Sequence, residues 1–126
     1  MISTLSLVAL GGAIGASLRW LTGVAVLRAL GPSDFPLAIV TVNVIGSFLM
    51  GFFVVAAAQR GLTHLSPFVM TGLLGGFTTF SAFSLETMTM IERGQMGHAG
   101  LYIFLSVGLS VGALALGLYV ARGVFL

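Results

Sequence analysis

One stretch of the sequence decides the fold: Thr71-Gly72-Leu73-Leu74-Gly75-Gly76-Phe77-Thr78-Thr79-Phe80-Ser81-Ala82-Phe83-Ser84. It lies deep inside an apolar segment, yet it contains too many glycines and hydroxyl side chains for a plain lipid-facing helix. Gly75 and Gly76 are poor helix formers, each costing about 1 kcal/mol relative to alanine. Non-helical backbone persists at membrane depth only where protein buries it or where it lines a water-filled cavity. We therefore predict that a membrane helix breaks near Gly75–Thr79 and restarts, and that the freed backbone groups form a site.

The composition predicts an integral membrane protein of one domain. Of the 126 residues, 58% are hydrophobic and only 6% are charged, whereas about a quarter of a soluble domain is charged. The length accommodates about four spans of roughly 20 residues each, so we expect an all-α protein whose single domain covers residues 1–126. The absence of cysteine excludes disulfides and thiolate metal sites. The net charge of +2 is too weak to indicate nucleic-acid binding.

The four predicted spans are Ile2–Leu27, Pro36–Ala58, Pro67–Met90 and His98–Ala121. We expect the first to be a span and not a signal peptide, because no basic segment precedes its apolar run. Loops one and three then carry Arg28 and Arg93 on one side of the membrane, and the other side carries Arg60 and Arg122. Orientation follows the excess of Lys and Arg in cytoplasmic loops, and two against two favours neither direction.

This balance of charge predicts dual insertion, in which some copies enter the membrane one way up and some the other. Two such copies can form an antiparallel homodimer whose two-fold axis lies in the membrane plane. Four thin, glycine-rich helices are also too few to enclose a pathway alone. The broken stretches of the two copies would meet near the midplane, where their carbonyls can converge on one central cation.

Two polar residues inside the spans each have two interpretations. Arg19 shares a helix face with Gly11 and Gly15, whose spacing allows close helix packing, and it lies about two-thirds along the first span. It either snorkels to the interface or provides a fixed positive charge that attracts anions to an aqueous vestibule. Asn43 either hydrogen-bonds a neighbouring helix or lines a pore as a donor.

Aromatic and hydroxyl side chains follow regular spacings in spans three and four. Phe80 and Phe83 share a face beside the break, and the positive edge of an aromatic ring can face a small anion. A polar track in span four recurs every four residues: Tyr102, Ser106 and Ser110. Serines in spans often bond their own helix, which is the alternative for each serine of the track. In span two, we interpret Ser47 and Gly51 as a close-packing pair.

Three motifs carry a resemblance to a known family: Gly11-Gly12-x-x-Gly15-x-x-x-Arg19-Trp20, Thr41-Val42-Asn43-x-x-Gly46-Ser47, and Gly75-Gly76-Phe77-Thr78-Thr79-Phe80-Ser81-x-Phe83-Ser84. Over nearly its whole length, the chain resembles the Fluc (CrcB-type) fluoride channel family. The third motif is long and highly specific, whereas the first alone is weak. Trp20 replaces a more usual tyrosine or phenylalanine.

The resemblance implies an antiparallel homodimer in the bacterial plasma membrane, with two fluoride pathways that are each built from both subunits. It implies passive, selective export of fluoride, which relieves toxicity. Phe80 and Phe83 would line the pathways with their ring edges, and Asn43 would lie beside them. A central, non-transported sodium ion would be held by the backbone carbonyls of Gly75 and Thr78. The implied pathway residues are Arg19, as the vestibule arginine, and Asn43, Thr79, Phe80, Ser81, Phe83, Tyr102, Ser106 and Ser110.

The leading alternative is a proton-coupled exporter of the small multidrug-resistance type, which also forms four-span antiparallel dimers. Such an exporter needs a titrating carboxylate in the membrane. Glu86 is the only candidate, and it lies near a span end. A second alternative, an accessory subunit that only packs against partners, predicts no transport by the purified protein. An enzyme is not expected, because the sequence shows no nucleophile, base and orienting group, and both histidines lie in loops.

Overall fold

The computed structural model describes all residues 1–126 and contains helices but no strands. The elements in chain order are α1 (Ile2–Leu30), α2 (Leu37–Arg60), η1 (Thr63–Leu65), η2 (Pro67–Leu74), α3 (Gly75–Phe77), α4 (Ser81–Glu92) and α5 (Met96–Phe125). Four segments are long and apolar enough to cross a membrane: Ile2–Leu30, Leu37–Arg60, Thr63–Glu92 and Met96–Phe125. The prediction of an all-α chain with four spans is confirmed, and each span extends a few residues beyond at least one of its predicted ends.

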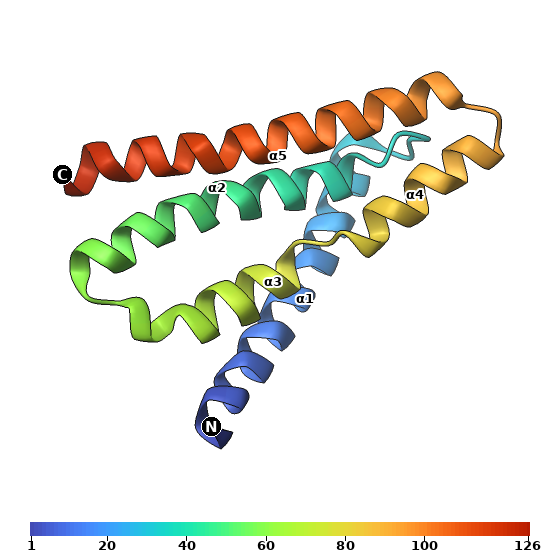
Figure 1. The fold of residues 1–126 in the computed structure, drawn as a ribbon. Coiled ribbons are helices and arrows are strands. Elements are labelled where there is room, and N and C mark those ends of the chain that lie inside the picture. The colour runs from blue at the N-terminus through green and yellow to red at the C-terminus, as the bar shows by residue number, and fades with distance from the viewer.

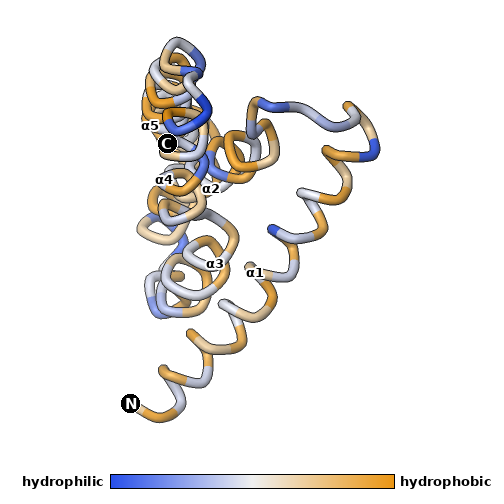
Figure 2. The backbone as a smooth tube through the Cα atoms, turned by 90° about the vertical axis from the view of Figure 1, so that its right-hand side faces the viewer, coloured by the Kyte–Doolittle hydropathy of each residue, from blue (hydrophilic) through white to orange (hydrophobic).

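The helices form two closely packed groups: α2 packs against α5, and α1 packs against η2 and α3. In Figure 1, α2 and α5 run side by side, η2–α3 and α4 follow one another below them, and α1 crosses behind at a steep angle. Figure 2 shows that α1 diverges from the other helices toward its C-terminal end. Its contacts are concentrated on η2 and α3, the half of span three that precedes the break.

Glycines allow two pairs of helices to touch backbone to backbone. Gly15 of α1 is buried, and a Cβ at this position would collide with the backbone of η2. In the same seam, a Cβ on Gly76 would lie 2.8 Å from the carbonyl oxygen of Gly12. The α2–α5 seam is built in the same way, because a Cβ on Gly51 or Gly117 would collide with a carbonyl of the opposite helix.

Span three is interrupted, but not at its glycines. Gly75 has helical backbone angles (φ −62°, ψ −37°) and begins the short helix α3, which also contains Gly76. The chain becomes extended at Thr78 (φ −85°, ψ 163°), and α4 resumes at Ser81. The predicted break is confirmed, but it comprises Thr78–Phe80. Gly76 serves the contact with α1, whereas Gly75 is exposed and makes no close contact with α1.

A small core ties α4 to α5. Met90, Ala99 and Tyr102 are each at most 2% exposed, and Phe83 is among the side chains packed around them. Elsewhere, large apolar side chains point outward along whole helices, as Phe104 does on α5. A helix that is apolar on all sides is typical of a membrane span.

Candidate functional site

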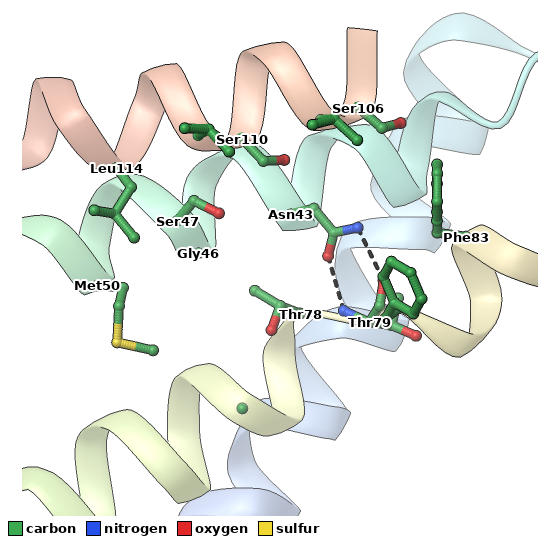
Figure 3. Close-up of a pocket in the computed structure, with 14 residues that line it drawn as sticks. Asn43, Gly46, Ser47, Met50, Thr78, Thr79, Phe83, Ser106, Ser110 and Leu114 are labelled. Atoms are coloured by element: carbon green, nitrogen blue, oxygen red, sulfur yellow. Dashed lines mark hydrogen bonds between the residues drawn. The ribbon is translucent and has the colours of Figure 1, made fainter. Parts of the chain in front are cut away.

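The break is held by the side chain of Asn43 in α2. Asn43 Nδ2 donates a hydrogen bond to the carbonyl oxygen of Thr79 over 2.9 Å, and the Thr79 N–H donates to Asn43 Oδ1 over 2.8 Å (Figure 3). The carboxamide thus satisfies both backbone groups of a residue that has left the helix, which would otherwise be costly to bury. The helix-bonding interpretation of Asn43 is therefore confirmed. A carboxamide has two N–H donors, so one remains for another partner, and the pore-lining interpretation stays a prediction.

Thr79 in turn starts the helix that follows. Its side chain is 9% exposed, and its Oγ1 accepts a hydrogen bond from the Ala82 N–H over 3.1 Å. This contact is the usual chemistry of a threonine at a helix N-terminus. Ser81, another predicted pathway residue, is exposed, and its Oγ lies 3.4 Å from Thr79 Oγ1.

Two backbone carbonyls lose their helical donors as a result. In a continuous helix, the Gly75 carbonyl would accept from the Thr79 N–H and the Thr78 carbonyl from the Ala82 N–H. The first N–H is bound to Asn43 and the second to Thr79 Oγ1. These two carbonyls are the ones expected from the resemblance to hold a cation.

An open groove of about 450 Å³ runs along the break between α2, α4 and α5 (Figure 3). It is lined by six of the nine predicted pathway residues: Asn43, Thr79, Phe80, Phe83, Ser106 and Ser110. It is also lined by Ser47, which we had interpreted only as a packing residue. Ser47 lies one helical turn beyond Asn43, and this i, i+4 spacing is the sequence signal that places both on one face. Gly51, its supposed partner in packing, contacts α5 instead.

Three aromatic rings form a row at one end of this groove. The ring centroids of Phe80 and Phe83 are 5.4 Å apart, and those of Phe83 and Tyr102 are 5.1 Å apart. Phe83 is half-buried and Tyr102 is fully buried, whereas Phe80 is 76% exposed. Phe80 therefore begins the row on an uncovered surface, and the row leads to the buried phenol of Tyr102, whose ring also contacts Phe35 at a centroid distance of 5.5 Å.

Two hydroxyls of the polar track are buried without a partner. Tyr102 Oη and Ser106 Oγ lie near each other, but neither has a hydrogen-bond partner within 3.5 Å, and their residues are 0% and 6% exposed. A buried polar group left unpaired costs about 1–3 kcal/mol, so two such groups one helical turn apart indicate a place for a ligand. Ser110, the next member, is half-buried in the groove.

Arg19 lies apart from this groove. It lines a second cavity of about 470 Å³ between α1 and α2, together with Trp20 and Val42. Thr79 borders both cavities, so the broken backbone separates them. The half-buried Arg19 lines this open hollow between α1 and α2, and both interpretations of its charge stay open.

The family model described as CrcB-like protein, Camphor Resistance (CrcB), matches residues 6–118. The chain belongs to the CrcB-like family. A relative from Ruegeria sp. (strain TM1040) is 68% identical over 124 residues, which cover 98% of each chain, and is named fluoride-specific ion channel FluC. A relative of the same name from Roseobacter denitrificans is 68% identical over 126 residues, covering 99% of this chain and all of that protein.

A third CrcB-like relative of that name, from Paracoccus denitrificans, is 49% identical over 118 residues, which are 94% of each chain. These matches confirm the family resemblance drawn from the motifs. The relatives are named as ion channels, which agrees with the expectation that the chain is not an enzyme. Four apolar helices in a membrane channel family also confirm a multi-pass membrane protein.

Proposed function

We propose that this chain is a fluoride channel of the bacterial plasma membrane, through which fluoride leaves the cell passively. The relatives' name supports the choice of ion. The observation that carries the proposal is the groove beside the break. The unpartnered hydroxyl of Ser106 lines this groove, and that of Tyr102 is buried one helical turn away, in a row of aromatic rings that begins in the groove. In this reading the pathway consists of the groove residues together with Ser81, which lies beside Thr79, and Tyr102, which lies beside Phe83.

The lining suits a small anion with strongly bound water. A bare anion in hydrocarbon is prohibitively costly, so a pathway has to replace its water. Serine and tyrosine hydroxyls, the free N–H of Asn43 and the ring edges of Phe80 and Phe83 are donors or positive edges of this kind. None carries a full charge, so each holds the ion weakly enough for release. The charge of Arg19 would attract anions to the vestibule.

An antiparallel homodimer would complete the pathway. One side of the groove is open, and Phe80 lies 76% exposed at its edge, as expected where a second copy is to cover it. The two Arg residues at each end of the bundle support insertion in both orientations. In a Ser33→Cys variant of this cysteine-free chain, an impermeant thiol reagent should label about half of the copies from outside intact cells. Labelling of all copies or of none would overturn dual insertion.

A sodium ion near the dimer axis fits the released carbonyls. The carbonyls of Gly75 and Thr78 have lost their helical donors, and both residues line the open groove, where a second copy can bring an equivalent pair. Carbonyl oxygens are suitable ligands for a hard cation. When bound, the ion would supply positive charge that offsets the cost of an anion crossing the midplane.

The proton-coupled exporter is the weaker proposal. Its coupling residue would have to be Glu86, and Glu86 lines neither cavity. The exporter proposal also gives no role to the Asn43 carboxamide, which binds the backbone at the break.

Fluoride efflux from liposomes that contain only the purified protein tests the channel directly. The liposomes contain fluoride, the pH is equal on both sides, and a potassium ionophore balances charge. An electrode should then record rapid fluoride loss, and liposomes loaded with chloride should lose no chloride. Efflux only under a proton gradient would favour the exporter. Absence of any flux, in preparations whose folded state is verified, would favour the accessory subunit.

A further inference from the structure

Each carbonyl released at the break is released by a different side chain. Asn43 Oδ1 binds the Thr79 N–H, the helical partner of the Gly75 carbonyl, over 2.8 Å. Thr79 Oγ1 binds the Ala82 N–H, the helical partner of the Thr78 carbonyl, over 3.1 Å. We propose that Asn43 and Thr79 are positioning residues for a sodium ion at the break, one keeping each carbonyl available. This inference rests on the sodium ion of the proposed function.

The two side chains oppose the ordinary tendency of the backbone. Once a helix has formed, each further residue adds one backbone hydrogen bond, so the α3 turn would tend to continue into Thr79. Asn43, which lies 36 positions earlier in the chain, prevents this by taking both the N–H and the carbonyl of Thr79. Without it, the Thr79 N–H is free to return to the Gly75 carbonyl.

The surroundings strengthen both contacts. Thr79 is 9% exposed and Asn43 is half-buried, so little water competes for these bonds. Because a carbonyl oxygen has two lone pairs, a returning N–H would weaken it as a ligand without removing it. We therefore expect a graded loss of sodium affinity and not an all-or-none effect.

Thermal unfolding of the purified protein measures this affinity without using flux. Sodium is titrated against N-methylglucamine at constant ionic strength, and Tm should rise because the ion binds only the folded state. Thr79→Val and Asn43→Leu should each raise the sodium concentration for half of the rise by roughly thirtyfold, because the equivalent carbonyl of the second copy also regains its hydrogen bond, and two such bonds amount to about 2 kcal/mol. Because each variant acts on a different carbonyl, either one tests the proposal if the other folds poorly.

Two further variants separate positioning from general stability. Thr79→Ser keeps the acceptor for the diverted N–H, so it should keep the wild-type sodium midpoint. Thr87→Val is the matched control, because Thr87 is also 9% exposed but its hydroxyl donates to the carbonyl of Phe83 in its own helix over 2.8 Å. It should change Tm without moving the midpoint.

The outcomes distinguish this inference from the channel itself. A wild-type sodium midpoint in both Thr79→Val and Asn43→Leu would overturn the positioning roles and leave the sodium ion and the channel standing. A wild-type protein whose Tm does not respond to sodium would overturn the ion and the positioning roles together. The fluoride proposal would then still be decided by the efflux measurement.

Discussion

Before the break, η2 and α3 lie against α1, and their glycines bring the two backbones into contact, as Gly76 does with Gly12. After the break, α4 leaves α1 and packs on α5, with Phe80 76% exposed beside an open groove. One continuous apolar segment thus builds a tight seam in its first half and an open, partly polar wall in its second. The break separates the two halves, because α1 contacts η2 and α3, whereas α4 contacts α5.

Two glycine pairs with the same spacing show a related contrast. Gly11 and Gly15 in α1 are buried against η2, and an added Cβ would meet backbone at both. Gly108 and Gly112 in α5 have nothing within 4 Å of an added Cβ. The four-residue spacing therefore predicts a face that can pack closely, but not which such faces are covered within one copy.

The largest effect is expected for leucine at the closed seam. Gly15→Leu would force its side chain into the backbone of η2, and overpacking costs about 1–3 kcal/mol even where side chains can move. We expect loss of folded, monodisperse protein in detergent, measured by size-exclusion chromatography and thermal unfolding. Gly108→Leu is the control and should fold. Equal folding of both variants would contradict the contrast between closed and open faces.

The next largest effect concerns the open half. Phe80→Ile and Phe83→Ile keep apolar bulk but remove the ring edge, and the loss of about 1.4 kcal/mol of ion stabilisation would lower fluoride efflux by about tenfold. The matched control is Phe104→Ile, since Phe104 is 74% exposed on α5 and lines neither cavity. Normal efflux in both groove variants would refute their assignment to the pathway.

Ser106→Ala is expected to have two smaller effects: the protein should become more stable, and fluoride efflux should fall. Removing a buried, unpartnered hydroxyl relieves a desolvation cost, so the free energy of unfolding should rise by about 1 kcal/mol. Fluoride efflux should fall by roughly fivefold, because one donor is lost from the pathway. In the control Ser17→Ala, the lost hydroxyl is one that bonds its own helix at the Ala13 carbonyl, so efflux should not change. A drop in Tm for Ser106→Ala would show that its hydroxyl has a structural partner.

Much of this architecture could be predicted from the sequence, because hydropathy determines the spans and the glycine–hydroxyl stretch indicates a break. The position of the break could be predicted only in part: the expected range Gly75–Thr79 overlaps the observed Thr78–Phe80, but helix propensity also pointed to Gly75 and Gly76, which are helical. It is set by the bonds between Asn43 and Thr79, which are 36 residues apart. Local propensity contains no information about such a contact. The cap of Thr79 on Ala82 follows from that break and was missed for the same reason.

The candidate pathway shows the same division. The i, i+4 spacing of the α5 hydroxyls correctly placed Ser106 and Ser110 on one groove, because a helix repeats its faces at that spacing. The four-residue spacing also predicted that Arg19 shares a helix face with the α1 glycines. It could not predict the cavity that Arg19 lines, because that cavity depends on how α1 diverges from α2. The role of each residue in conduction stays a prediction.

The central claim is that fluoride crosses the membrane along the groove of the open half. The chain has no native cysteine, so a single Ser110→Cys thiol can be modified with silver ions during fluoride efflux, with mass spectrometry to count the modified copies. A Leu116→Cys variant, whose side chain lies outside the groove and is 53% exposed on α5, provides the control. The account predicts that modification of Cys at position 110 stops efflux while the control continues. Fluoride efflux that persists through fully modified Ser110→Cys channels, or a thiol there that silver never reaches, would contradict it.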